Sequence, residues 1–180
     1  MAEVTLKGGD KLKQYLNNIS YKVNTGAELR VGFLANASYA DGKPVAMIAA
    51  IQEFGAPRAG IPPRPFFRNM IAKHQDEWPK GFATQLRETN YDVKATFERA
   101  GAAIAGQLRQ SIVDTNDPPL SPITLMIRKM KSEGKTITRA SLGEAARRVA
   151  AGESTGGISS KPLVETGHLL NSVDYEVKLK

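Results

Sequence analysis

The feature that most constrains the fold is a proline-rich block that joins two helical patterns. The block runs from Gln52 to Arg68, and Gly55 directly follows its first helical pattern. Glycine commonly follows the last turn of a helix, and proline fixes φ while driving the residue before it towards extended conformations. The segment 56–63, with its three prolines, is therefore predicted to be a long but stiff loop. Pro65 then suits the start of the next helix.

Apolar spacing predicts helices and short strands around this block. The helix over 44–54 is apolar around most of its circumference, which predicts burial on two sides or a place between subunits. The longest helical pattern, 91–113, carries small residues that let another element approach its backbone. The other expected elements are a helix over 10–20 with Asp10 as N-cap, a strand over 28–35, a polar turn over 36–43, a helix over 122–131 capped by Ser121, a helix over 167–171 capped by Thr166, and a strand over 173–179.

Basic residues gather in one part of the chain. The whole sequence has 25 basic and 18 acidic residues, a formal net charge of +7, and segment 121–161 alone has a net charge of +5. A basic balance is consistent with nucleic acid, with an acidic partner surface, or with solubility alone. Aromatic side chains are almost absent from this segment, which argues against stacking on single-stranded bases.

Much of this basic segment is predicted to lie outside a packed core. Residues 132–160 are poor in large apolar side chains and rich in glycine, serine, threonine and basic residues. Such a composition predicts a flexible basic excursion, ordered mainly by a partner, from a single domain over residues 1–180. Leu142 to Ala151 has only a weak helical pattern.

Residue types that support catalysis or metal binding are sparse. The chain has no cysteine, which excludes disulfides, thiolate metal sites and a thiol nucleophile. Of its two histidines, His74 has no second ligand at a metal-binding spacing, and His168 follows a Thr-Gly turn where it would cap a helix or meet another subunit. Neither a nucleophile elbow nor a phosphate-binding loop appears. The sequence therefore predicts no catalytic residue, no metal site and no cofactor.

The arginines of the proline-rich block have three interpretations. Arg58, Arg64 and Arg68 have no nearby acid in sequence after Glu53. They are solvated or form a local ion pair with Glu53, they pair with a neighbouring subunit, or they contact DNA phosphates. Phe66 and Phe67 are adjacent on a helix and so face different directions, which predicts that at least one serves a second surface.

Two motifs resemble a known family. The first is Glu53-Phe54-Gly55, followed by a short loop and by Ile61-Pro-Pro-Arg-Pro-Phe-Phe-Arg68. The second is Leu163-Val-Glu-Thr-Gly-His-Leu-Leu-Asn-Ser-Val173. In their order and separation these resemble the blocks of tail-completion or head–tail joining proteins of long-tailed bacteriophages. Glu165 stands where that family often has aspartate, and the basic excursion is longer than the family pattern.

The resemblance implies an α+β fold with a small antiparallel sheet packed against the long helix 91–113. It further implies a non-enzymatic structural protein of the phage neck, assembled in the host cytoplasm as a ring of six-fold symmetry. The partners would be other copies of itself, the adjacent connector and the tail tube or terminator protein, with non-specific contact to passing DNA. No apolar run approaches the ~20 residues of a membrane helix. A tail terminator and a nucleic-acid-binding module remain as alternatives.

These expectations assign roles to particular residues. Gly55, Thr166 and Gly167 are predicted to form structural turns. The residues expected at a subunit interface are Glu53, Phe54, Arg58, Arg64, Phe66, Phe67 and Arg68. Those expected to contact DNA or a partner protein are Arg128, Lys129, Lys131, Lys135, Arg139, Arg147 and Arg148.

Overall fold

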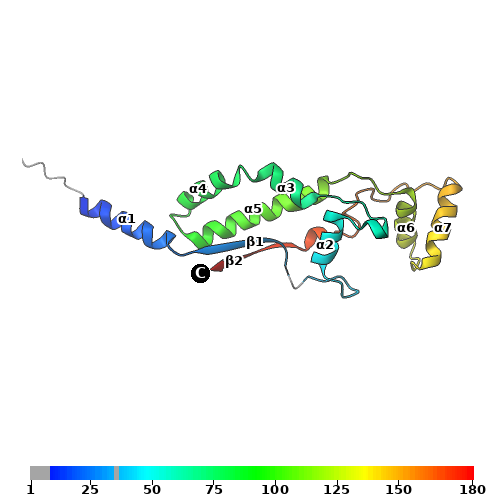
Figure 1. The fold of residues 1–180 in the computed structure, drawn as a ribbon, viewed down its shortest axis with the longest axis horizontal. Coiled ribbons are helices and arrows are strands. Elements are labelled where there is room, and N and C mark those ends of the chain that lie inside the picture. Colours follow the sequence, from blue (N-terminus) through cyan, green and yellow to red (C-terminus); the bar gives the residue numbers. More distant parts are fainter. Residues whose placement is uncertain (1–8, 35–36) are drawn as a thin grey trace, which may run out of the picture. The chain divides into compact units, whose positions relative to one another are not determined.

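The protein is an α+β chain in which a two-stranded antiparallel sheet packs against one long helix, as the sequence predicts. The computed structural model describes residues 9–34 and 37–180 (Figure 1). In chain order the elements are α1 (Gly9–Val23), β1 (Ala27–Phe33), α2 (Val45–Phe54), a short 3₁₀ helix (Pro57–Ala59), α3 (Phe66–His74), α4 (Trp78–Glu88), α5 (Val93–Asp114), α6 (Pro122–Ser132), α7 (Arg139–Ala150), α8 (His168–Asn171) and β2 (Val173–Leu179).

Contacts within the chain divide it into two compact units, and α5 contributes to both. Unit 1 takes in the described part of Met1–Gly32, with Ala72–Gly106 and Asp174–Lys180. Unit 2 consists of Phe33–Ile71 and Gln107–Val173. Each unit buries side chains of its own, such as Ala100 and Ala105 in unit 1 and Phe66 and Leu108 in unit 2. The single domain over residues 1–180 stays a prediction.

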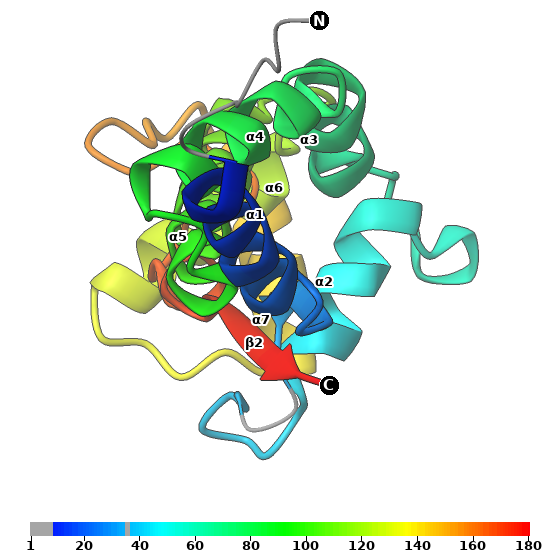
Figure 2. The same cartoon turned by 90° about the vertical axis from the view of Figure 1, so that its left-hand side faces the viewer.

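In unit 1, α5 lies between α4 and the sheet (Figure 2). The rings of Phe82 and Phe97 meet edge to face across α4 and α5, with centroids 5.3 Å apart. On the other side, Gly101 allows the sheet to approach, since a Cβ there would lie 2.8 Å from Leu29 Cδ1 and nearer still to the ring of Tyr175. The predicted close approach to the small residues of this helix is therefore confirmed.

Helix α1 leaves its apolar side chains uncovered. It contains no buried residue, and Leu12, Tyr15, Leu16 and Tyr21 are all more than half exposed. The helix already includes Gly9, so Asp10 lies in its first turn, and the prediction that Asp10 is the N-cap is wrong. A carboxylate in the first turn still favours the helix, because it faces the positive end of the helix dipole.

The core of unit 2 joins α2 and α3 to the second half of α5. Val45, Phe66, Met70 and Ile112 are at most 2% exposed. The Ser111 hydroxyl donates to the carbonyl of Phe66 at 2.7 Å, so α5 also fixes the start of α3. Helix α2 buries one stripe of residues and leaves other apolar side chains exposed, Phe54 among them. Within the subunit α2 is therefore covered on one side, and a place between subunits stays a prediction.

Helices α6 and α7 form an antiparallel hairpin with a small core of their own (Figure 1). Met126, Met130 and Ala145 are at most 1% exposed, and Ile127, Ile137 and Val149 pack against them. The Ser121 hydroxyl accepts from the N–H of Thr124 at 3.1 Å, so the predicted cap of α6 is confirmed. Residues 132–160 are therefore not one continuous loop. Helix α7 begins three residues before the weak helical pattern of the sequence, because Ser141 accepts from the N–H of Thr138 at 3.0 Å.

No helix in the described part of the chain combines the length and the apolarity that a membrane crossing needs.

Candidate functional site

A buried carboxylate ties together the two ends of the first motif. Glu53 lies in the last turn of α2 and is 4% exposed. Its carboxylate accepts from the backbone N–H of Phe67 at 2.8 Å and of Arg68 at 3.2 Å, so it caps the start of α3. Arg68 Nε donates to the same carboxylate at 2.8 Å. This set of contacts, named here the Glu53 clamp, satisfies N–H groups that the first turn of a helix leaves without a partner.

The clamp presents one aromatic and one basic side chain to solvent. The Arg68 side chain is 57% exposed, and its guanidinium lies over the ring of Phe54 at 5.1 Å from the centroid. Phe54 itself is 65% exposed. A guanidinium over an aromatic face is held by the ring quadrupole. The clamp therefore sets the position of an exposed Phe54–Arg68 pair.

Arg64 serves the fold, because it lies inside the subunit. It is 5% exposed, and its Nε donates to the carbonyl of Pro118 at 3.0 Å. Its backbone N–H also donates to the carbonyl of Gln52 at 2.7 Å. Burial lowers the pKa of the Arg64 guanidinium, with a smaller contribution from the positive charge of Arg128. Arg64 thus holds the loop after α5 against the loop between α2 and α3.

The loop between α2 and α3 is closed by its own backbone. Ala56 and Ile61 exchange two hydrogen bonds, of 2.8 and 3.1 Å, around the short 3₁₀ helix. Gly55 has φ +76°, and a Cβ there would lie 2.8 Å from the backbone nitrogen of Pro63. Gly55 directly follows the last turn of α2, as the sequence predicts, and only glycine fits this conformation and this space. Arg58 lies exposed near the tip of the loop.

The second motif forms the predicted turn and short helix, but the N-cap of that helix is Gly167, so the prediction that Thr166 caps it is wrong. The Thr166 hydroxyl accepts from the N–H of His168 at 3.3 Å, and Gly167 has φ +73°. Helix α8 follows, and Leu163, Leu169 and Val173 are buried. The turn therefore sets where α8 and β2 begin.

Arg128 anchors the segment that leads into this turn. Its side chain is 8% exposed and donates to the carbonyls of Ser159, Lys161 and Pro162 at 2.8 to 3.0 Å. Its Nε lies 3.7 Å from the carboxylate of Glu165. Burial lowers the pKa of this guanidinium, and the charge of Glu165 opposes that effect. Arg128 is therefore a structural residue, which corrects the prediction that it contacts DNA or a partner.

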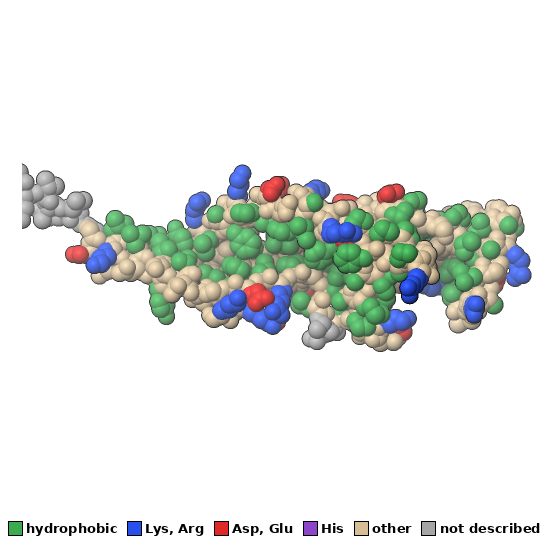
Figure 3. All heavy atoms as spheres, in the orientation of Figure 1, with side chains coloured by type: hydrophobic (Ala, Val, Ile, Leu, Met, Phe, Trp, Pro, Cys, Tyr) green, Lys and Arg blue, Asp and Glu red, His purple; other side chains and the backbone are tan. Residues whose placement is uncertain are grey.

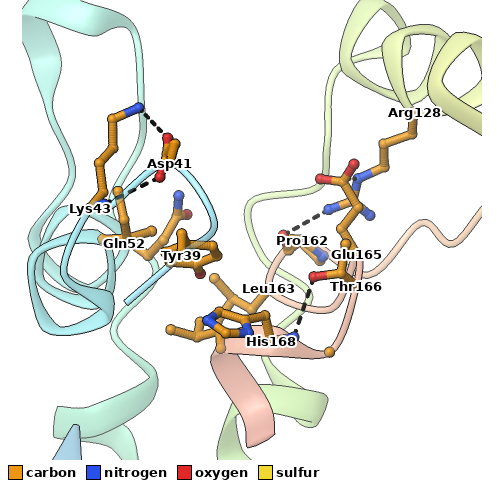
Figure 4. A pocket seen from close by; sticks show the side chains of 13 residues that line it. Tyr39, Asp41, Lys43, Gln52, Arg128, Pro162, Leu163, Glu165, Thr166 and His168 are labelled. Carbon is orange, nitrogen blue, oxygen red and sulfur yellow. Dashed lines mark hydrogen bonds and ion pairs between the residues drawn. The ribbon is translucent and has the colours of Figure 1, made fainter. Parts of the chain in front are cut away.

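The second motif lines a pocket of about 280 Å³ in unit 2 with Leu163 and residues 165–169 (Figure 4). Gln52, the residue directly before the first motif, lines the same pocket, and its Oε1 accepts from Arg64 Nη1 of that motif at 3.4 Å. His168 lies against Tyr39, with ring centroids 4.5 Å apart, and its Nε2 is 3.1 Å from the carbonyl oxygen of Ser38. A histidine nitrogen at this distance from a carbonyl oxygen donates its proton, so Nε2 is the donor of this hydrogen bond.

Charges around this pocket are paired. Asp41 accepts from Lys43 Nζ at 2.7 Å, and that hydrogen bond lowers the pKa of the Asp41 carboxyl. Glu165 accepts from Lys131 at 2.9 Å. Burial, and then the nearby charges of Asp41 and Glu165, raise the pKa of Tyr39. In the described part of the chain no group of three or more His, Asp and Glu side chains is placed to hold a metal ion.

Comparison with protein-family models, with curated protein sequences and with solved structures gives no match to this chain.

Most bases of the segment 121–161 are already bound to acids or to carbonyls. Lys129 donates to Glu153, and Lys135 to Glu144, at 2.7 and 2.6 Å. Arg148 pairs with both Glu133 and Glu153 across the loops that flank α7. These pairs raise the pKa of Arg148 and lower that of Glu153 to about 2, in both cases chiefly through the hydrogen bond between the two. Arg139 and Arg147 are exposed, and neither makes such a contact with another described residue.

The structure thus separates the residues predicted at an interface into two groups. Glu53, Arg64 and Phe66 are buried inside the subunit, which corrects the prediction that they meet a neighbour. Phe54, Arg58 and Arg68 are exposed, and Phe67 is half-buried. For these four residues the interface role stays a prediction, as does a role in DNA or partner contact for the bases of the hairpin other than Arg128.

Sequence reasoning missed the anchors that join distant segments. Arg64 reaches Pro118, Arg128 reaches Pro162, and Lys161 Nζ donates to the carbonyl of Val113 at 3.0 Å. Each contact spans at least 34 residues, so no local spacing reveals it. The sequence around these carbonyls is rich in proline and glycine, which indicates loops. Backbone carbonyls in loops lack the hydrogen bonds of helices and strands, so they need side-chain donors from elsewhere in the chain.

Proposed function

We propose that this chain is a non-enzymatic structural protein of the neck of a long-tailed phage, which completes the tail and joins it to the head as part of a ring. One observation carries the proposal. The two motifs that resemble this family lie about 100 residues apart in the sequence, yet both belong to unit 2, where the second motif lines a pocket together with Gln52, the residue directly before the first motif. Residues that build one region together are expected to serve one structural purpose.

The use of polar residues within the motifs supports a binding role. Glu53 and Arg64 form hydrogen bonds inside the subunit, and Thr166 forms one within its own turn. The part of the first motif that faces solvent is the tip of a stiff loop, with Arg58, and the exposed Phe54–Arg68 pair. A stiff loop loses little conformational entropy on binding, and aromatic and arginine side chains are enriched in protein interfaces.

Exposed apolar side chains in both units support assembly with other copies. Unit 1 exposes the apolar side chains of α1, and unit 2 exposes Met47 and Phe54 of α2. The space-filling view shows that hydrophobic side chains reach the surface in many places on the face it presents (Figure 3). A ring subunit needs two different faces, because the contact that closes a ring is heterologous. A tail terminator would use the same kind of ring, and it differs only in the layer that it occupies.

The pairing of charges makes a nucleic-acid-binding module the weaker alternative. Such a module gains affinity by releasing counterions from phosphates through free basic side chains. Here Lys129, Lys131, Lys135 and Arg148 each already contact a carboxylate of the same chain.

Imaging of the particle neck tests the proposal. Symmetry-resolved reconstruction of virions that carry this gene product should place the chain in a ring between portal and tail tube. The purified ring should keep its size in high salt, because its contacts are largely apolar. A particle without this chain, or a protein whose DNA affinity falls steeply with salt, would overturn the proposal.

A further inference from the structure

Helix α7 turns one full stripe of residues away from its own core. Ser141 and Ala145 are buried on the inner side, against α6. On the other side six residues at helical spacing are exposed: Arg139, Leu142, Gly143, Ala146, Arg147 and Ala150. We name these six residues the outer stripe. Positions three and four apart lie on one face of a helix, so the outer stripe is one continuous surface.

The outer stripe carries two arginines that form no ion pair within the described residues, although the charge of Arg147 acts on the nearby Glu144. The nearby acids are already used, because Glu133 and Glu153 bind Arg148 while Glu144 binds Lys135. The outer stripe itself contains no acid. Arg139 and Arg147 are eight residues apart, which corresponds to about 12 Å along a helix. A partner of complementary charge therefore needs two carboxylates at about that separation.

Between the two arginines the outer stripe is apolar and shallow. Leu142 is 56% exposed, and a Cβ on Gly143 would meet nothing within 4 Å. Glycine inside a helix costs about 1 kcal/mol relative to alanine, and nothing in the subunit needs the missing Cβ. A backbone or side chain arriving from outside would use that space. An apolar centre flanked by arginines fits the anatomy of a protein interface.

We propose that the outer stripe binds an acidic segment of another protein of the particle, with one carboxylate at each arginine and an apolar side chain over Leu142 and Gly143. The inference deepens the proposed function and rests on it for the identity of the partner. Protein is favoured over DNA because phosphates would leave Leu142 without a contact, and because only two bases of the stripe are free.

A peptide titration tests the surface without any particle. The probe is a helical peptide of about 18 residues with two glutamates eight positions apart and a leucine between them on the same face. The full-length chain should bind it, and R139E/R147E should weaken binding at least about tenfold. K80E/R87E is the matched control, since it reverses two exposed charges seven residues apart on α4, and it should leave binding unchanged. Thermal unfolding checks that both variants fold.

Three results decide the peptide test. Weaker binding of the same peptide with glutamine in place of glutamate supports the proposal. Equal binding of the two peptides overturns it, because charge would then play no part. Binding of a DNA duplex of about 30 base pairs that R139E/R147E abolishes, with no binding of the peptide, also overturns it and assigns the stripe to DNA.

Cross-linking in assembled particles then identifies the contact. In Arg147→Lys a carbodiimide joins the lysine amine to a carboxylate within reach as an amide and takes up the water released. A cross-link from position 147 to an aspartate or glutamate of another particle protein is expected. Cross-links only to this chain, or none, overturn the proposal. If the chain is absent from particles, the proposed function is wrong, but the acidic-peptide binding by the outer stripe is not affected. The peptide titration tests that binding on the purified protein.

Discussion

The buried charges of the proline-rich block and the exposed ion pairs of the α6–α7 hairpin use the same residue types in opposite ways. In the block, Glu53 and Arg64 are at most 5% exposed and bind mainly backbone groups. In the hairpin, Glu133, Glu144 and Glu153 are about one-third exposed and bind side chains of lysine and arginine. The first arrangement fixes where the chain runs, whereas the second joins helices and loops that already have a small apolar core.

The difference shows that burial, more than residue type, decides what a charge does for this protein. A buried charge whose partner is removed remains without compensation, which is costly. An exposed ion pair is worth little, because water replaces the lost partner. We therefore expect substitutions in the block to damage the fold, and equivalent substitutions in the hairpin to leave it intact.

The largest effect is expected for Glu53→Ala. This substitution leaves the N–H groups of Phe67 and Arg68 without their acceptor, and should lower the free energy of unfolding by about 3 kcal/mol. The measurement is a urea titration followed by circular dichroism. Glu144→Ala is the matched control from the hairpin and should cause a much smaller change. Equal losses in the two variants would break the comparison.

The path of the chain could be predicted from sequence better than the use of its charges. Helix α5, the cap at Ser121 and the turn at Gly167 follow from apolar spacing and from residues with a defined conformational role. Arg64 and Arg128 could not be placed, because their carbonyl partners come from loops at least 31 residues away. For α7 the spacing of Thr138 and Ser141 was a local signal, but methionine and alanine gave a weak apolar pattern for its core.

Alanine substitutions at one glycine of the block and one of the hairpin should change the free energy of unfolding in opposite directions. Gly55→Ala should lower the free energy of unfolding by about 2 kcal/mol, because φ is +76° and the added Cβ meets the backbone of Pro63. Gly143→Ala should raise it by about 0.5–1 kcal/mol, since the added Cβ meets nothing in the subunit and alanine favours the helix. Urea titration of both variants measures whether each substitution lowers or raises the free energy of unfolding. Destabilisation by Gly143→Ala would mean that the outer stripe is packed within the subunit.

The smallest effect is expected for the acid response of the hairpin. The pKa of Glu153 is lowered to about 2 from 4.5 by its hydrogen bonds with Arg148 and then Lys129. A lowered pKa in the folded state gives a contribution to stability that is complete above pH 4.5 and is lost as the pH falls towards 2. NMR titration of the Glu153 carboxyl carbon should therefore show its midpoint well below 4.5. In Arg148→Met the midpoint should rise most of the way back, while Lys129 holds it slightly lower than 4.5. Lys80→Met is the control and should not move it. A wild-type midpoint near 4.5 would mean that the Arg148–Glu153 pair does not persist in solution and does not help to hold α7 against the loop that follows it.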